Sequence, residues 1–236
     1  IKLRGGCIHH DHGVLGAAAF PAAERRKIRL LKEAGFNAVR TAHNPPSSAL
    51  LAACDRLGMI VMDEVFDEWN KEKRPAGYRL WFEDWWKRDI ANTVRRERNH
   101  PCVFSYSIGN EIFEIDGTSK AAQWSKALSD EIRKYDTTRF VTAGINKGFI
   151  RRSRPEKIDP ADYAAFLEKK YEGLDFRDMA LLTNEITAKF EEPLDIVGCN
   201  YYYESYLIEH ECYPNRVIWG SETHALHFYD SWSLTR

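Results

Sequence analysis

Short apolar runs recur along the chain, and a stretch with helical spacing of apolar residues follows nearly every run. Runs that are apolar on both faces, such as MIVM and CVFSYSI, are typical of a sheet covered by helices on both sides. Parallel strands need such helical crossovers, so the pattern predicts a parallel α/β fold. The predicted strands are IKLRGGCI (1–8), FNAVR (36–40), MIVMD (59–63), CVFSYSI (102–108), RFVTA (139–143), LDIVGCN (194–200) and RVIWGS (216–221).

Residues that commonly start and stop helices support this order. Pro21 opens a helical stretch that stops at Gly35, and Ser47 precedes a shorter one that Gly58 closes. Proline in the first turn, serine at the N-cap and glycine just past the end are the expected punctuation. Further helices are predicted at 82–98 and 119–135, and a charged, helical region at about 146–193 is where we expect an insertion or a mobile loop.

Two folds alternate strands and helices in this way, an open doubly wound sheet and an eight-stranded barrel. The open sheet usually has a glycine-rich phosphate loop after its first strand, and GGCIHHDHG does not match GxGxxG. Nearly every run here ends in polar residues, as in barrel enzymes with an active site at the carboxyl ends of the strands. We predict one (β/α)8 TIM barrel domain, residues 1–236, as a fragment of a longer multidomain chain that stops before strand eight.

Composition limits the partners. With 34 basic and 35 acidic residues the net charge is −1, which gives no field to attract nucleic acid or an anionic membrane. No apolar stretch reaches the ~18 residues of a membrane span. The five cysteines form no close-spaced pairs, and Cys7, Cys102 and Cys199 lie in apolar runs, where we expect buried free thiols. Free thiols slightly favour a cytoplasmic location, which the sequence otherwise leaves open.

Two carboxylates, Glu111 and Glu222, follow the fourth and seventh runs. In an eight-stranded barrel these strands lie roughly opposite one another, so the two side chains can face each other across the mouth. Such a pair is what glycoside hydrolysis needs, because one carboxyl protonates the leaving oxygen while the other attacks or activates water. Taken singly, either glutamate could equally be a solvated residue of the rim.

Several stretches resemble the catalytic barrel of glycoside hydrolase family 2, the β-galactosidase and β-glucuronidase family. They are FNAVRTAHNPP, MIVMDEVFDEW, RRERNHPCVFSYSIGNEI and VIWGSET, and the resemblance covers most of 1–143 and of 194–224. The most specific part is the order arginine, asparagine, His-Pro, strand and then Asn-Glu.

The resemblance implies roles for individual residues. Glu111 would be the general acid/base and Glu222 the nucleophile of a retaining enzyme, with their carboxyl groups about 5–5.5 Å apart. Asn110 would hydrogen-bond the sugar 2-hydroxyl. Tyr201 and Arg40 would lie beside Glu222 and keep it charged and correctly aimed. The enzyme would be exo-acting, and its substrate would be a terminal β-linked sugar of a glycoside or oligosaccharide.

Histidines of the family that contact the sugar match His9 and His43, with His10 and Asp11 as close substitutes. We therefore place Asp11 with His9 and His43 among the substrate-binding residues. GNE and SET favour the β-galactosidase branch, and β-glucuronidase or another family specificity is the alternative. The Asn146-Lys147 pair is interpreted as an ordinary loop. Family members often form homo-oligomers, through domains outside this chain.

The sequence departs from the family at a metal site. Some β-galactosidases of the family hold magnesium with a glutamate and a histidine after strand three and with the acid/base glutamate. Here DEVFDEWN offers Glu68 and then Asn70 in place of the histidine. We therefore expect no cofactor, with magnesium as the one alternative. Asp63 and Glu64 are interpreted as a structural network below the site.

Three other interpretations fit part of the pattern. HHDH after the first strand could begin a zinc site of a metal-dependent barrel hydrolase, but such enzymes need histidines after strands five and six, where Thr142 and Asn200 stand. An endo-acting cellulase or mannanase would share Asn-Glu and a distal glutamate, but not the histidine-rich first strand end. An inactive carbohydrate-binding barrel fragment is the alternative outside the enzymes.

Overall fold

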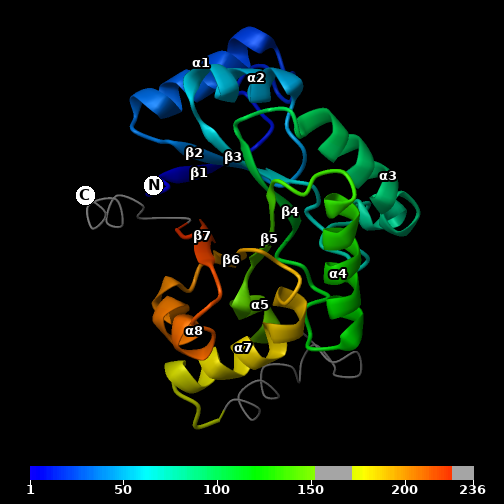
Figure 1. Ribbon diagram of the computed structural model, residues 1–236, viewed down its shortest axis with the longest axis vertical. Coiled ribbons are helices and arrows are strands. Elements are labelled where there is room, and N and C mark those ends of the chain that lie inside the picture. Colours follow the sequence, from blue (N-terminus) through cyan, green and yellow to red (C-terminus); the bar gives the residue numbers. More distant parts are fainter. Residues whose placement is uncertain (152–171, 225–236) are drawn as a thin grey trace.

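The computed structural model describes residues 1–151 and 172–224 of the chain. In these parts of the chain, seven parallel strands form one sheet in sequence order, and this sheet curves into a nearly closed barrel (Figure 1). The predicted barrel fold is therefore confirmed. The strands are β1 (Gly5–Ile8), β2 (Ala38–Thr41), β3 (Ile60–Glu64), β4 (Val103–Asn110), β5 (Phe140–Ile145), β6 (Val197–Asn200) and β7 (Ile218–Glu222).

Helices lie outside the strands and cover the outer face of the sheet (Figure 1). They are α1 (Pro21–Glu33), α2 (Ser48–Leu57), α3 (Arg79–Glu97), α4 (Ser119–Arg133), α5 (Lys147–Arg151), α7 (Phe176–Glu191) and α8 (Tyr206–Cys212), with a short 3₁₀ turn, η1 (Tyr203–Ser205). None of the helices in the described parts is long and apolar enough to cross a bilayer.

The residues predicted to start and end helices do so in the structure. Pro21 is the first residue of α1, and the Ser47 hydroxyl accepts a hydrogen bond from the Leu50 N–H at 3.1 Å. Gly58 ends α2 in the left-handed conformation, with φ of 67°, which glycine adopts without steric cost. Helix α3 begins three residues before the predicted start at position 82. Local sequence chemistry thus sets the helix ends.

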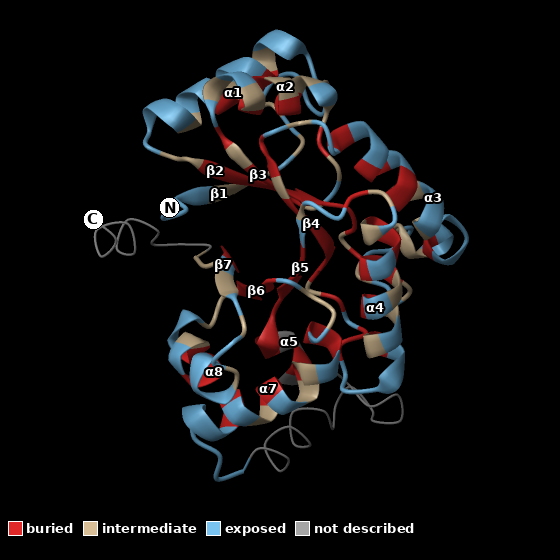
Figure 2. Cartoon of the chain, viewed as in Figure 1, coloured by how far each residue is buried: buried red, intermediate tan, exposed pale blue. Residues whose placement is uncertain are grey.

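Burial is concentrated in the strands and on the inner faces of the helices (Figure 2). Val61, Tyr106 and Ile108 are completely buried, as expected for strands packed on both faces. Cys54, Cys102 and Cys199 are buried free thiols, but the prediction for Cys7 was wrong, because it is only partly buried. Cys7 lies on β1, which is the edge of the sheet and is covered less completely.

The two edge strands approach each other, since the Cys7 thiol on β1 lies 3.4 Å from the Ser221 carbonyl oxygen on β7. The strands run parallel and in sequence order, so their last residues gather at one end of the barrel. Four of these last residues have carboxylate or amide side chains, which can transfer protons or form hydrogen bonds: Glu64, Asn110, Asn200 and Glu222. The fold therefore brings residues from the whole length of the chain to one rim.

The region from 146 to 193 was predicted to hold an insertion or a mobile loop. Helices α5 and α7 occupy its described parts, and residues 152–171 lie outside the described residues. The prediction of an insertion, like that of a single domain over 1–236, stays a prediction.

Candidate active site

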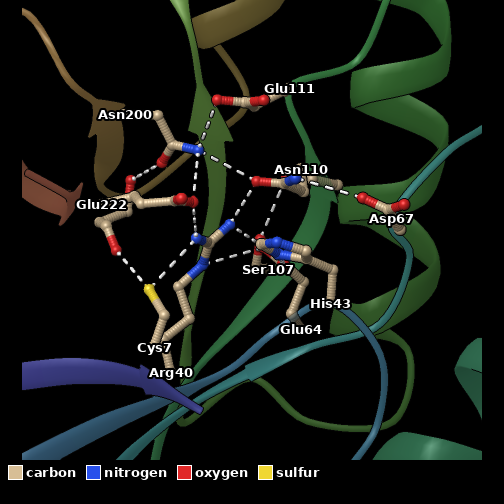
Figure 3. A network of polar contacts seen from close by, with 12 residues as sticks. Cys7, Arg40, His43, Glu64, Asp67, Ser107, Asn110, Glu111, Asn200 and Glu222 are labelled. Atoms are coloured by element: carbon tan, nitrogen blue, oxygen red, sulfur yellow. Dashed lines mark hydrogen bonds and ion pairs between the residues drawn. The ribbon is translucent and has the colours of Figure 1, made fainter. Parts of the chain in front are cut away.

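Glu222, the last residue of β7, accepts hydrogen bonds from three side chains, two of which, Arg40 and Asn200, are labelled in Figure 3. The Tyr201 hydroxyl donates to Oε1 at 2.6 Å, and the Arg40 guanidinium donates to Oε2 at 3.0 Å. The Asn200 amide donates to the same Oε2 at 3.2 Å. Three donors from β2, β6 and the residue after β6 therefore fix both oxygens of this carboxylate.

Glu111 follows β4 directly and has an unusual backbone conformation, with φ of 46°. Its N–H donates to the Gly144 carbonyl at 2.7 Å, which holds this turn against β5. The Glu111 carboxylate accepts hydrogen bonds from the amides of Asn146 at 2.8 Å and Asn200 at 3.2 Å. Left-handed backbone at a residue other than glycine is uncommon and occurs often at functional sites.

The amide nitrogen of Asn200 lies between the two carboxylates (Figure 3). It is 3.2 Å from Glu111 Oε1 and 3.2 Å from Glu222 Oε2, so these oxygens are at most twice that distance, 6.4 Å, apart. Carboxyl groups about 5–5.5 Å apart are typical of retaining glycosidases, and about 6.5–9.5 Å of inverting ones. The carboxylates of Glu111 and Glu222 are therefore close enough to act on the same bound molecule.

Arg40 and Glu64 form a buried ion pair beside Glu222, with Arg40 Nη2 at 2.7 Å from Glu64 Oε2. Burial alone would raise the pKa of Glu64, but the Arg40 charge and hydrogen bonds from His43 and Ser107 outweigh it and hold that pKa below its ordinary value. Burial disfavours the charged form of Arg40 too, yet the charge of Glu64 keeps the Arg40 pKa above its usual range. Both groups are therefore charged.

Asn110, the last residue of β4, shares this network. Its Oδ1 accepts from Arg40 at 2.7 Å and from Asn200 at 3.0 Å, and its Nδ2 donates to Asp67 at 3.2 Å. An amide nitrogen carries two hydrogens, so among the described residues one N–H of Asn110 has no acceptor and can donate to a ligand.

The histidines after β1 and β2 lie at the edge of this network. His43 Nδ1 is 2.6 Å from Glu64 Oε1, and the His9 ring packs edge-on against the His43 ring at 5.5 Å between centroids. Asp11 is exposed and has no polar partner among the residues described. The structure thus brings the predicted site residues together, apart from Asp11, while their roles stay predictions.

Several residues of the network were not predicted as site residues, among them Asn146, Asn200, Glu64 and Asp67. Asn146 was interpreted as an ordinary loop residue, yet its amide is a direct partner of Glu111. A consistent rule, that polar residues at the end of each strand belong to the site, would have found Asn146, Asn200 and Glu64.

The structure does not support a zinc site after β1. His10 Nε2 hydrogen-bonds the Asn44 carbonyl at 2.9 Å, whereas His12 faces Glu24 at 3.6 Å, so the two imidazoles do not share a ligand. Among the described residues, Asp55, His100 and Cys102 form the one group of three or more His, Cys, Asp or Glu side chains that are close enough to share a metal ion. Cys102 precedes β4, so this group lies at the opposite end of the strands from Glu111.

A cavity of about 330 Å³ lies at the carboxyl ends of β5, β6 and β7. Asn146 and Tyr201, which bond Glu111 and Glu222 respectively, contribute to its wall. The complete lining is Asn146, Gly148, Tyr201, Tyr202, Tyr203, Glu204 and Thr223. This aromatic and polar wall is suited to a sugar, which presents both apolar ring faces and hydroxyl groups.

Comparison with known proteins identifies the same fold and family. Residues 1–230 match the model described as "Glycosyl hydrolases family 2, TIM barrel domain". The β-galactosidase BoGH2A of Bacteroides ovatus is 37% identical over 216 residues, which is 85% of this chain and 23% of that protein. A putative β-glucuronidase of Formosa agariphila is 37% identical over 160 residues, or 67% of this chain and 14% of that protein.

Solved structures agree with these matches. A glycosyl hydrolase family 2 member from Bacteroides cellulosilyticus has a TM-score of 0.77 and 42% identity, covering 99% of this chain and 25% of that one. A β-glycosidase from Bacteroides vulgatus has a TM-score of 0.67 and 28% identity, covering 92% of this chain and 22% of that one. The chain therefore spans about a quarter of the length of these relatives.

Proposed function

The chain belongs to glycosyl hydrolase family 2, whose TIM barrel domain it matches, and on that basis we propose that it carries the catalytic centre of a retaining exo-β-glycosidase. The observation that carries this proposal is the position of Asn200 Nδ2, which is 3.2 Å from Glu111 and 3.2 Å from Glu222. Two carboxylates that meet across one amide nitrogen are a suitable pair for double displacement.

In the first step Glu111, as the carboxylic acid, gives its proton to the glycosidic oxygen. A Glu222 oxygen attacks the anomeric carbon at the same time, so that the bond to the leaving group breaks and a glycosyl–enzyme ester forms. In the second step the Glu111 carboxylate takes a proton from water, the water oxygen attacks the anomeric carbon, and Glu222 leaves. The inversions at both steps cancel, and the product retains its configuration.

The surroundings of the two glutamates support this division of roles. Glu222 accepts from a guanidinium and a phenol, which orient its oxygens and stabilise the carboxylate that must attack. Glu111 accepts from two neutral amides in the described part of the chain. Asn110 has one N–H without an acceptor in residues 1–151 and 172–224, and this N–H would donate to the sugar 2-hydroxyl, a contact that strengthens in an oxocarbenium-like transition state.

We propose β-galactosides as the first substrates to test. A relative named β-galactosidase covers 85% of this chain at 37% identity, and other relatives are named putative β-glucuronidases. The family-level match supports a β-linked glycoside as ligand and leaves the sugar to experiment.

The experiment uses the full-length polypeptide that contains this chain, a panel of nitrophenyl β-glycosides and the variant Glu222→Ala. We expect turnover by the wild type, its loss in the variant, and partial rescue by azide with a glycosyl azide of inverted configuration as product. Rescue through Glu111→Ala with retained configuration at the azide would separate the roles of the two residues. An inverted hydrolysis product from the wild type, or sugar binding with no turnover on any β-glycoside, would contradict the proposal.

A further inference from the structure

Lys73, in the loop between β3 and α3, extends its ammonium group to the end of β4. Lys73 Nζ donates to the Asn110 carbonyl at 2.5 Å, to the Asp67 carbonyl at 2.7 Å and to the Asp67 carboxylate at 3.0 Å. An ammonium group has three hydrogens, so these three oxygens use its full donor capacity. The Lys73 side chain is largely buried, with 11% of its surface exposed.

These contacts restrain Asn110 and, through its peptide group, Glu111, the predicted general acid/base. The Asn110 carbonyl belongs to the peptide group that leads into Glu111, so a hydrogen bond to it fixes the plane from which the left-handed turn at Glu111 starts. The Asp67 carboxylate that receives Lys73 also accepts from Asn110 Nδ2 at 3.2 Å. Lys73 therefore restrains the main chain of Asn110 directly and its side chain through Asp67.

The charge at this position is also satisfied within the protein. Asp67 Oδ1 receives the Lys73 ammonium group at 3.0 Å and the Asn110 amide at 3.2 Å. Asp67 is thus an anion paired with a fixed cation. His43, Lys73 and Asn110 are the groups that face this carboxyl.

The residues that would hold a magnesium ion after strand three do not form a ligand set here. Glu68 is buried, and its two oxygens accept the backbone N–H groups of Lys73 and Arg79, both at 3.0 Å. Asn70 gives its N–H to Glu114 at 2.7 Å and supplies an amide where the family's metal ligand is an imidazole. Both oxygens of Glu68 are therefore engaged by its own loop, and in the described part of the chain Glu68 and Asn70 share no hydrogen-bond partner.

We propose that Lys73 is the built-in cation of this active site: its ammonium group orients Asn110 and Glu111 for proton donation, and no divalent metal is needed there. The claim that Lys73 orients Glu111, called the positioning part below, rests on the proposed glycosidase activity. The claim that no divalent metal is needed, called the cation part below, is tested by Mg²⁺ binding and does not depend on that activity. Lys73 is a positioning residue, since it reaches Glu111 only through the peptide group of Asn110.

The kinetic test compares Lys73→Met with Lys71→Met in the full-length polypeptide. Lys71 lies on the same loop, but its side chain is half exposed and pairs with Asp116 at 3.2 Å. Proton donation matters for a poor leaving group such as phenol and little for 2,4-dinitrophenol. We expect Lys73→Met to lower kcat/KM for the phenyl β-glycoside by roughly 10-fold more than for the dinitrophenyl β-glycoside, because a weaker contact from Asn110 to the sugar slows both substrates alike and only impaired proton donation separates them. Lys71→Met changes neither.

An equal loss on both substrates would indicate a merely structural role and overturn the positioning part. If Lys73→Met does not fold, Asp67→Asn is the milder variant, because it keeps an acceptor for Lys73 and removes the charge. Asp67→Asn should also lower kcat/KM more for the phenyl than for the dinitrophenyl β-glycoside, with a smaller difference between the two substrates.

The cation part is tested by calorimetric titration of metal-free wild-type protein with Mg²⁺ alone, together with the thermal midpoint with and without Mg²⁺. We expect no saturable heat and an unchanged midpoint. Saturable binding that Glu68→Gln abolishes would overturn the inference. Since this measurement needs no turnover, it remains decisive if every β-glycoside fails, which would count against the proposed function alone.

Discussion

Arg40 and Glu64 form an ion pair at 2.7 Å in which both side chains are almost completely buried, and the same guanidinium reaches Glu222 at 3.0 Å. Glu64 is therefore the anion that holds Arg40 in place for the predicted nucleophile. Removal of one partner of a buried pair leaves an uncompensated charge, which is costly. This relationship links the stability of the barrel to the geometry of the site.

We expect Glu64→Gln to lower the free energy of unfolding by on the order of 3–5 kcal/mol at pH 7. Denaturation in urea would measure this, with Glu33→Gln as control, because Glu33 forms an exposed pair with Arg29 at 3.5 Å. The pKa of Glu64 is lowered in the folded protein, so its contribution is present above the unfolded value of 4.5 and is lost as the pH falls through the folded pKa. An equal effect of both substitutions at pH 7 would contradict this assignment.

Tyr201→Phe removes the hydrogen bond of 2.6 Å to Glu222 and little else. The variant should lower kcat by roughly 10–1000-fold, because the phenol orients the carboxylate and must release it as the ester forms. Mass spectrometry after incubation with a 2-deoxy-2-fluoro glycoside bearing a good leaving group would show slower labelling of Glu222. Unchanged labelling would mean that Tyr201 does not assist the nucleophile.

Asn146 and Asn200 differ in what they contact, and this difference predicts distinct kinetics. Asn146 bonds Glu111, whereas Asn200 bonds both Glu111 and Glu222. We expect Asn146→Ala to slow hydrolysis of phenyl β-glycosides more than that of dinitrophenyl β-glycosides, and Asn200→Ala to slow both by about 10-fold or more. The same dependence on leaving group in the two variants would contradict the separate assignments.

Asp63 is completely buried on β3, and burial raises its pKa to about 8. The folded protein then keeps a proton that the unfolded chain releases near 3.8, so the free energy of unfolding should fall as the pH rises from about 4 to about 8. Asp63→Asn cannot titrate. Between pH 5 and pH 8 we expect the wild type to lose on the order of 1–3 kcal/mol more than Asp63→Asn. Asp130→Asn, at an exposed position, should follow the wild type.

The sequence by itself determined the order of strands and helices, because the signals for them are local. Apolar runs, Pro21, Ser47 and Gly58 act within a few residues and were each found at the predicted position. It also indicated Glu111 and Glu222, since a carboxylate directly after an apolar strand is visible in the chain and a parallel barrel sends all strand ends to one rim.

Only the tertiary structure decided which side chains reach these carboxylates. Arg40 and Glu222 are 182 positions apart, and Asn200 and Asn110 are 90 apart, so their contacts depend on how far the barrel closes and on the register of each strand. The contact from Lys73 to Asn110 depends in addition on the path of a loop that no periodic pattern describes. Hydrogen bonds are made or lost over less than an ångström, a precision that the three-dimensional packing of the strands sets and the spacing of residues along the chain does not.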